Sequence, residues 1–400
     1  MKRISKISLN RPGRVEMKVY FLIMLFLMNN SLLFAQPIPV IDVSKDYPEK
    51  RIVLQDIADI DYVLLETNDD VLLDRDYKIV HISDNYIVVS NPRQGDVFIF
   101  GRNGKIKYAF NHRGQGSMEY LNAMTLVFDE QNKEVFITNR RATGLEFLVY
   151  SEEGKYKRTL KCPSDVSSIG AAYTFDDEHI LVYDYLVNVG NFEKQPYRLV
   201  SKNDGTITPL NITLPQRYST IMEVEGTRDE EGLSWYTFFQ IESNWIDGQD
   251  FIISDISCDT LFRLKPDKSI TPLVRQTPSV HRTDPKIYLS SLLQTEKYML
   301  LRRDKMTPDS KDYITTLLYD FSNGEIVEVG SSRYPFLNGD WKAQFHSIKP
   351  EAATPKNTLV FTIQAHLLHE YSEYTTGVLA QIASTIDEED NPVLMIAKFR

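Results

Sequence analysis

The 400-residue sequence contains only two cysteines, Cys162 and Cys258. A zinc site built on cysteine thiolates is excluded by count, because such sites use up to four of them. Two alternatives stay open for this pair: one disulfide, formed in an oxidising compartment, or two buried free thiols. We favour the free thiols, because the two cysteines lie far apart in the sequence.

Short motifs of several catalytic classes are also missing. The sequence has no Gly-x-Ser-x-Gly elbow, no Walker-type phosphate loop and no EF-hand calcium loop. The segment from His366 to Glu370 places two histidines three positions apart with the glutamate last. Zinc proteases of the His-Glu-x-x-His type place the histidines four apart with the glutamate between them. We expect this segment to be a loop or a short helix with surface histidines.

A long apolar run is absent, and the run near the start, Val19–Met28, is shorter than the roughly 20 residues of a membrane span. Basic residues precede it, and the small residue Ala35 stands before the polar Gln36, which is the pattern of a signal peptide. We expect residues 1–35 to be removed on export, with a retained anchor as the alternative and Met17 as an alternative start. No cysteine lies near the cleavage point, so we expect no lipid anchor.

Positive charge is scarce outside this leader. The formal net charge is −10, and removal of the leader's six basic residues and one acidic residue leaves −15. A protein that binds phosphate backbones needs the opposite sign, so we exclude nucleic acid as a partner. Scattered acids are typical of the solvated surface of a soluble protein. We expect the periplasm or the cell surface as its location, with no membrane span after cleavage.

What the sequence does contain is a repeat of short strands. Apolar runs rich in β-branched and aromatic residues alternate with Gly, Asn and Asp, which indicates strands and hairpins. Five turns, centred on Gly104, Gly154, Gly205, Asp267 and Gly324, follow one another at steps of about 50 to 60 residues, close to the span of a four-stranded propeller blade. The predicted strands of these cycles are 86–89, 97–100, 105–110, 134–138, 145–150, 155–160, 179–183, 197–201, 206–210, 251–255, 260–264, 269–274, 298–302, 314–320 and 325–329.

A sixth cycle has strands at 358–363 and 393–399 but too little chain after them for a further one. The N-terminal segment Tyr62–Thr67 can supply it, which closes the ring and removes sheet edges that invite aggregation. We therefore predict an all-β protein, with one six-bladed β-propeller over residues 36–400. Its blades are four-stranded and antiparallel, and the N-terminal strand closes the last blade.

Two segments break this rhythm. Residues 211–242 lengthen the connection between the third and fourth cycles, and residues 365–390 interrupt the last blade. In the second segment the apolar residues Val378, Leu379, Ile382 and Ile386 have helical spacing. This predicts one short helix near the C-terminus.

The most specific local feature is the loop that connects the first and second cycles. Two glycines separated by one residue allow successive backbone N–H groups to form an anion-binding nest, and a neighbouring arginine adds a positive charge. The alternative, which we weigh more heavily, is a purely structural turn between blades. The candidate ligand-binding residues of this loop are His112, Arg113, Gly114, Gln115, Gly116, Glu119 and Tyr120.

This loop resembles the Gly-x-x-Gly-x-Gly-Pro-Gly-Glu-Tyr signature of six-bladed β-propellers from Bacteroides-type bacteria, which are relatives of the NHL-repeat propellers. The match covers Gly114, Gln115, Gly116, Glu119 and Tyr120, whereas Asn111, Ser117 and Met118 depart from the signature. Three further stretches are similar to the family's N-terminal, mid-chain and closing strands: Val53–Ala58 with Tyr62–Thr67, Asp259–Leu264 and Glu388–Leu394. The resemblance implies a propeller and export, and it supplies no catalytic residues.

Other candidates lie outside the loop. Trp235 belongs to an aromatic run that can stack on a sugar ring, although large aromatics form core by default. His346 is the best single candidate for the central channel. Propellers can gather histidines there, as the NHL-type amidating lyases do with their metal, and the other histidines on separate cycles are His81, His112, His179 and His281. The acidic runs at 176–178 and 387–390 are interpreted as solvated turns.

We therefore expect an exported propeller that acts as a non-catalytic ligand-binding or protein-interaction scaffold. Its ligand is a small molecule, a glycan, a peptide or an outer-membrane protein partner, and no cofactor is predicted. The alternative is a metal-dependent lyase or hydrolase at the central channel, acting on a glycan or a peptide. That alternative needs a divalent metal and at least three of the histidines at one point.

Overall fold

A computed structural model describes residues 38–142, 144–163, 169–184, 196–212, 218, 221–225, 236–240, 244–307, 314–329, 336–341, 346–348 and 353–400. For residues 221–225, 236–240 and 346–348 it describes the backbone only. The chain divides into two units, Met1–Ile38 and Pro39–Arg400. The strands and helices of the described residues belong to the second unit.

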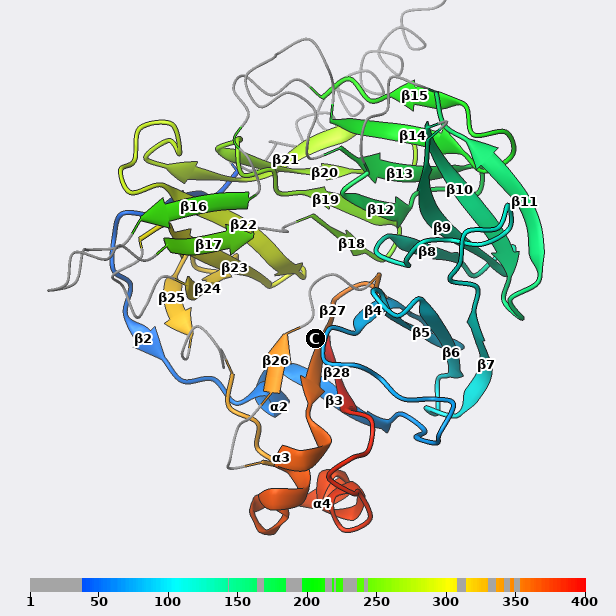
Figure 1. Cartoon of the computed structure of the whole chain (residues 1–400). Coiled ribbons are helices and arrows are strands. Elements are labelled where there is room, and N and C mark those ends of the chain that lie inside the picture. Colours follow the sequence, from blue (N-terminus) through cyan, green and yellow to red (C-terminus); the bar gives the residue numbers. More distant parts are fainter. Residues whose placement is uncertain are drawn as a thin grey trace, which may run out of the picture. The chain divides into compact units, whose positions relative to one another are not determined.

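The described strands of Pro39–Arg400 form six sheets of four or five strands and one two-stranded hairpin. Each of the six sheets is one blade of a β-propeller (Figure 1). Blade 1 contains β4 (Lys78–Ile82), β5 (Tyr86–Asn91), β6 (Asp96–Gly101) and β7 (Ile106–Asn111). Blade 2 contains β8 (Leu126–Asp129), β9 (Glu134–Arg141), β10 (Gly144–Ser151) and β11 (Tyr156–Lys161). Blade 3 contains β12 (Ala171–Thr174), β13 (His179–Tyr183), β14 (Tyr197–Ser201) and β15 (Ile207–Pro209). Blades 4 and 5 contain β18 (Trp245–Asp247), β19 (Asp250–Ile253), β20 (Thr260–Leu264), β21 (Ile270–Thr277), β22 (Ile287–Gln294), β23 (Tyr298–Lys305), β24 (Ile314–Asp320) and β25 (Ile326–Val329).

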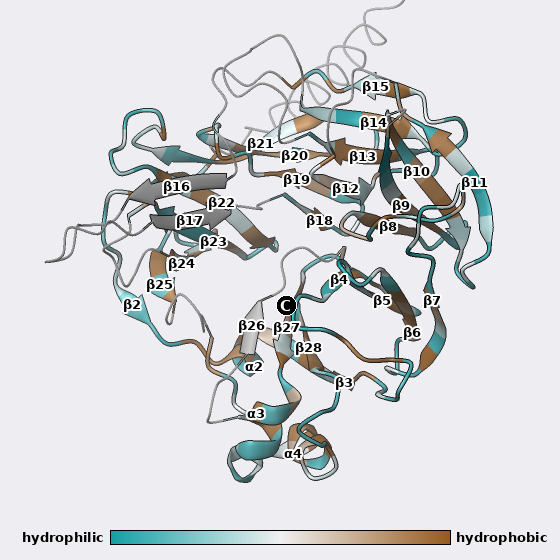
Figure 2. Cartoon of the chain, in the orientation of Figure 1, coloured by the Kyte–Doolittle hydropathy of each residue, from teal (hydrophilic) through white to brown (hydrophobic). Residues whose placement is uncertain are grey.

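The middle strands of each blade are the most apolar (Figure 2). Every residue of β5 is buried, whereas the outer strand β7 alternates between half-buried and exposed positions. This follows from the radial arrangement, because a middle strand is covered on both faces by the neighbouring blades and an outer strand also faces water. The cores accordingly join adjacent blades: Val88 and Ile99 of blade 1 pack with Ile137 and Leu148 of blade 2.

Blade 6 is built from both ends of the described chain. Its order is β26 (His346–Ile348), β27 (Thr358–Ile363), β28 (Val393–Phe399) and β3 (Ala58–Leu64). The register of β3 on β28 pairs Leu64 with Val393 and Asp61 with Ile396. The predicted closure by an N-terminal strand is confirmed, and the strand begins and ends a few residues before the expected 62–67.

Two further N-terminal strands cover outer edges of other blades. Strand β1 (Val40–Asp42) pairs in parallel with β21 of blade 4, and β2 (Glu49–Lys50) pairs in parallel with β25 of blade 5. The chain therefore runs along two blade edges before it enters blade 6. The outer strands of these two blades are thereby partly covered, and the new edges are strands of only three and two residues, too short to invite pairing with other molecules. The strand repeat in the sequence does not predict these two strands.

A short segment of blade 6, Ala353–Thr354, pairs with the inner edges of two other blades, and we call it the inner clasp. Ala353 forms a parallel bridge with His81 of β4, and its carbonyl accepts a hydrogen bond from the Ile82 N–H (2.8 Å). Thr354 forms a parallel bridge with Asp247 of β18 and accepts from the Gly248 N–H (3.2 Å). The inner clasp thus connects blade 1 with blade 4.

The irregular segments differ from the sequence prediction in two places and add a hairpin in a third. The predicted helix is α4 (Gly377–Ala383), but α3 (Ala365–Glu370) and the 3-10 turn η1 (Ser372–Tyr374) precede it. The stretch Val53–Ala58, which resembles a family strand, contains the helical turn α2 (Leu54–Ile57) instead. The long third-to-fourth connection holds the hairpin of β16 (Ile221–Glu225) and β17 (Tyr236–Gln240).

The turn at Gly104 offers a test of how closely the blades pack. Gly104 and Gly324 occupy equivalent turns with similar positive φ, +77° and +73°. A Cβ on Gly104 would overlap the Leu64 carbonyl oxygen of β3, whereas a Cβ on Gly324 would have its nearest neighbour, Tyr319 Oη, at 3.9 Å. We expect Gly324→Ala to cost about 1 kcal/mol, the cost of the left-handed conformation alone. Gly104→Ala should cost at least about 2 kcal/mol more, because the blade contact must also move. Urea unfolding of both variants measures the difference in the free energy of unfolding. Equal losses would contradict the close contact between Gly104 and β3.

Candidate functional site

The signature loop is held by contacts within the protein. Tyr120 is fully buried, donates its hydroxyl to the Gly95 carbonyl (2.7 Å) and accepts from the His112 N–H (2.9 Å). Burial raises the pKa of Tyr120 to about 12, so the hydroxyl remains a donor. The Nε2–H of His112 donates to the Gly154 carbonyl (2.7 Å), and the imidazole stacks on Tyr150 with 5.2 Å between ring centres. These contacts fix the loop between blades 1 and 2.

The two glycines of the loop make room for Glu119. The Glu119 carboxylate accepts a hydrogen bond from the Gly116 N–H (2.7 Å). A Cβ on Gly114 would overlap that carboxylate, and a Cβ on Gly116 would lie 3.0 Å from it. The carboxylate occupies the place where a bound anion would meet the backbone N–H. The geometry thus favours the structural interpretation of the loop.

Arg113 is exposed at the side of this loop. Its Nε donates to the Leu121 carbonyl (3.3 Å), and its side chain lines an open cleft together with Asp74 and Asp96. Two carboxylates in the same cleft disfavour an anion there. The seven ligand-binding assignments in the loop stay predictions.

A double-mutant cycle separates the two interpretations. Gly114→Ala must displace the Glu119 carboxylate, so we expect a loss of about 1 kcal/mol, the value of a typical hydrogen bond. Glu119→Ala removes the same bond, so the double variant should be little worse than either single one. Urea unfolding measures the three losses, with Gln115→Ala at the exposed position between the glycines as the control. Additive losses would contradict a structural role of the Glu119 contact.

Those of the other sequence candidates that the structure describes have separate positions. Trp235 lies outside the described residues, and so does the side chain of His346. The remaining histidines on separate cycles have separate partners: His81 contacts Glu130, His179 contacts Asp176, and His281 contacts Tyr218 and the Ser257 carbonyl. Within the described ranges, no group of three or more His, Cys, Asp or Glu side chains could hold a metal ion.

Cys162 and Cys258 are free thiols and do not form a disulfide, which agrees with the alternative that we favoured from the sequence. Burial raises the pKa of Cys162 to about 12. His366 and His369 are exposed on α3, which agrees with the expected helix with surface histidines. None of these side chains forms a site with the central channel.

Two cavities lie in the space enclosed by blades 1 to 4 and the inner clasp. Five residues line both of them, and we call this shared ring the waist: His81, Phe128, Thr174, Ile246 and Ala353. The first four come from the innermost strands of blades 1 to 4, and Ala353 comes from the inner clasp. Only His81 of these five residues could be singled out from the sequence, because the innermost strands carry no clear pattern.

On one side of the waist the channel opens into a cavity of about 770 Å³, which we call the acidic mouth. Its walls are the turns between the first and second strands of blades 1 to 4 and the residues that follow the inner clasp. Acidic side chains from three of these turns line it: Asp84, Asp129, Glu130, Asp176, Asp177 and Glu178. Asp84, Asp177 and Glu178 are exposed, and the other three have partners within the protein.

Hydrogen bonds between blades fix the walls of the acidic mouth. His81 of blade 1 bonds Glu130 of blade 2 (Nε2–Oε2, 2.8 Å), and Asn85 donates to the other Glu130 oxygen (3.0 Å). Lys202 of blade 3 donates to Asp129 of blade 2 (2.7 Å), and both side chains are at most 5% exposed. A buried ion pair of this kind resists separation, because either partner alone would be an uncompensated buried charge.

The same contacts set the ionisation of the two acids. The His81 hydrogen bond lowers the pKa of Glu130 from 4.5 to about 2, against the opposing effect of burial. Burial by itself would raise the pKa of Asp129, but the Lys202 and Asn132 hydrogen bonds bring it below its ordinary value. Both carboxylates are therefore charged at neutral pH.

Glu130 should make stability depend on pH in a defined window. Its pKa is lower in the folded protein, so its contribution is fully present above about pH 4.5 and is lost as the pH falls toward about 2. We expect Glu130→Gln to be less stable than the parent near pH 6 and the difference to shrink toward pH 2. Thermal melts over this range measure it, with the exposed Asp177→Asn as the control. A difference that is constant with pH would contradict the assignment.

The comparisons with known proteins agree with this fold. The chain is similar to the solved structure of a Bacteroides fragilis protein that is named as an inferred exported protein. The TM-score is 0.59, with 13% identity over 90% of this chain and 99% of the relative. It is also similar to a member of the DUF4221 family from Bacteroides vulgatus, with a TM-score of 0.50 and 9% identity over 86% of this chain and 99% of the relative. At these identities the likeness shows the fold alone. The comparison with curated proteins gives no match.

The part of the chain that the structure describes contains no helix with the length and apolar character of a membrane span. The six blades, the N-terminal closing strand and the two Bacteroides structures support the resemblance to Bacteroides-type propellers that the loop signature gave. A family model described as "Domain of unknown function (DUF4934)" matches residues 38–398. This chain is a six-bladed β-propeller and belongs to the DUF4934 family.

Proposed function

We propose that this protein is an exported, non-catalytic binding propeller that takes a positively charged peptide segment at the acidic mouth. The observation that carries the proposal is the cavity of about 770 Å³ between the turns of four blades. Its size lies within the range of ligand sites, roughly 300 to 1,000 Å³. Loops at one end of a rigid scaffold are also the usual place for recognition.

The construction of the acidic mouth supports binding rather than chemistry. The Lys202–Asp129 and His81–Glu130 contacts occupy its inner charged groups and hold neighbouring blades at fixed positions. A preformed wall loses little entropy when a ligand arrives. The exposed carboxylates of Asp84, Asp177 and Glu178 then set the sign of the charge that a ligand meets.

Opposite charge at the mouth would chiefly give selectivity and a fast encounter. A lysine- or arginine-rich segment of a protein partner is favoured over a neutral glycan, because the excess of carboxylates attracts its positive charge and a neutral glycan has no net charge to attract. The same excess disfavours anionic ligands at this mouth.

Export is the second part of the proposal. The leader at residues 1–35 has the charge and apolar pattern of a signal peptide, and a structural relative is named as exported. We infer that the folded propeller acts in the periplasm or at the cell surface, without a lipid anchor. We also propose that this chain is related to the NHL-repeat propellers.

Binding of a labelled oligolysine peptide, followed by fluorescence anisotropy, tests the site. We expect the triple variant Asp84→Asn, Asp177→Asn, Glu178→Gln to weaken binding roughly tenfold at low salt, because each exposed charge contributes up to about 1 kcal/mol. Added salt should reduce the difference.

The matched control is Asp387→Asn, Glu388→Gln, Glu389→Gln, which removes three exposed acids of the segment before β28. It has the same change of net charge and lies outside the acidic mouth. Equal weakening by both triple variants would show a nonspecific attraction and would overturn the assignment of the mouth. Binding of an oligosaccharide in place of the peptide would replace the proposed ligand class.

A further inference from the structure

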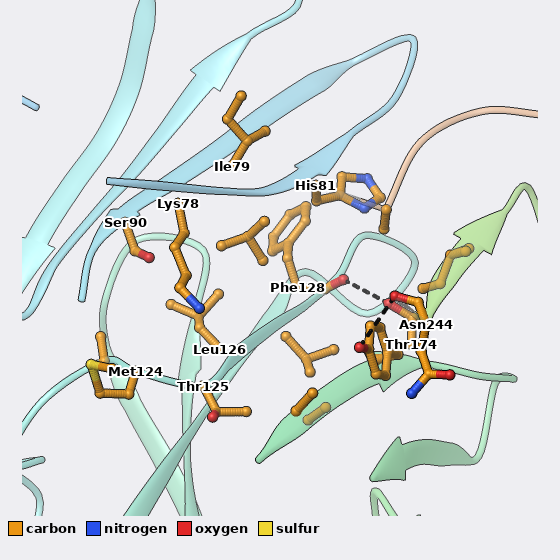
Figure 3. Close-up of a pocket in the computed structure, with 18 of the residues that line it drawn as sticks. Lys78, Ile79, His81, Ser90, Met124, Thr125, Leu126, Phe128, Thr174 and Asn244 are labelled. Carbon is orange, nitrogen blue, oxygen red and sulfur yellow. Dashed lines mark hydrogen bonds between the residues drawn. The ribbon is translucent and has the colours of Figure 1, made fainter. Parts of the chain in front are cut away.

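A second, smaller cavity lies on the opposite side of the waist, and we call it the inner chamber. It has a volume of about 80 Å³ and lies among the first strands of blades 1 to 3 and Asn244 (Figure 3). A water molecule needs about 10 to 15 Å³ on this measure, so the chamber has room for a group of a few heavy atoms.

The charge of the inner chamber differs from that of the acidic mouth. Among the described residues that line it there is no Asp or Glu, although the chain as a whole is strongly acidic. Lys78 lines it, and Figure 3 shows this side chain extending from β4 toward Leu126 and Thr125 of the next blade. An ammonium has three N–H donors, so a partner within the protein leaves donors for a ligand.

Ser90 supplies an independent sign of a ligand. It is 1% exposed, lines the inner chamber, and its Oγ has no hydrogen-bond partner among the described residues. A buried hydroxyl without a partner is costly and rare. Ser90 is also the direct cross-strand partner of Lys78. Directly paired residues place their side chains on the same face of a sheet, so the Ser90 hydroxyl and the Lys78 ammonium both lie on the face that lines the inner chamber.

The apolar part of the wall strengthens the attraction between Lys78 and a bound anion. Leu126, Phe128, Ala171 and Met124 line the inner chamber beside these polar groups. Apolar surroundings lower the local dielectric, so a buried anion meets a stronger attraction to Lys78 than it would in water. The Thr125 side chain is 8% exposed and adds another hydroxyl to the lining.

We propose that the inner chamber binds an oxyanion, a carboxylate or phosphate group, which accepts hydrogen bonds from Ser90 and Lys78. This site goes beyond the proposed function, because it has the opposite charge preference and lies across the waist from the acidic mouth. The two assignments stand on different residues and can fail separately.

Selectively labelled methionine methyl groups allow a direct test by NMR. Met124 lines the inner chamber, whereas Met118 lies on the same connection outside its lining. Titration of the full chain with sodium formate, acetate or phosphate should shift the Met124 signal in a saturable manner and leave Met118 unchanged. Sodium chloride at matched ionic strength is the control for screening.

Two substitutions assign the binding groups. Ser90→Ala should weaken binding about tenfold, as expected for one hydrogen bond to a charged group, and Lys78→Met should abolish saturable binding. Lys398→Met, at an exposed strand position of blade 6, should change nothing. Absence of a saturable shift with all three anions, or a shift unaffected by Ser90→Ala, would overturn the proposal.

A stability measurement in anion-poor buffer separates binding from folding. Ser90→Ala removes a hydroxyl without a partner, so its melting temperature should equal or exceed that of the parent. A clear drop would show that the hydroxyl serves the fold, and the proposal would fail. The peptide affinity of the acidic mouth should be unchanged in this variant, so loss of one site does not imitate loss of the other.

Discussion

The antiparallel pairing of β3 with β28 is the contact on which the rest of the structure depends. It places seven residues from near each end of the described chain in one sheet. Each blade buries its faces only against its two neighbours, so an open ring would expose one face of two blades. The closed ring buries apolar side chains on both faces of blade 6. Phe361 and Met395 of blade 6 pack with Leu300 of blade 5, and Val63 and Ile396 pack with Val89 of blade 1.

Closure also makes the central site possible. The waist takes one residue from each of blades 1 to 4, and the inner clasp pairs with β4 and β18 at the same time. Such a segment can pair with two blades only if the ring holds them at a fixed separation. The inner clasp then covers strand edges that would otherwise carry unpaired backbone groups. The site is therefore a consequence of the ring and cannot be assigned to one blade.

The two sides of the waist differ in charge for a physical reason. The acidic mouth is built from turns, and turns favour Asp and Asn because these side chains bond nearby backbone N–H groups. Asp176 does this with the N–H groups of Glu178 and His179. The inner chamber is instead built from strands and the connections before them, and its lining carries hydroxyls and Lys78. The chemistry of the turns thus contributes to the polarity of the channel.

The sequence by itself determined the strands that are buried on both faces, such as β5, β10 and β28, and the turns at Gly104, Gly154, Gly205 and Gly324. Dense β-branched and aromatic runs between turn residues have few other solutions, so the repeat, the blade number and the closing strand could be predicted. The tertiary structure alone decided the waist, the inner clasp and the two cavities. Their innermost strands are short, and β12 is half-buried at every position, so no alternation marks them. Lys202 meets Asp129, and His81 meets Glu130, only because separate blades converge on one axis, and local patterns in a sequence carry no information about such distant contacts.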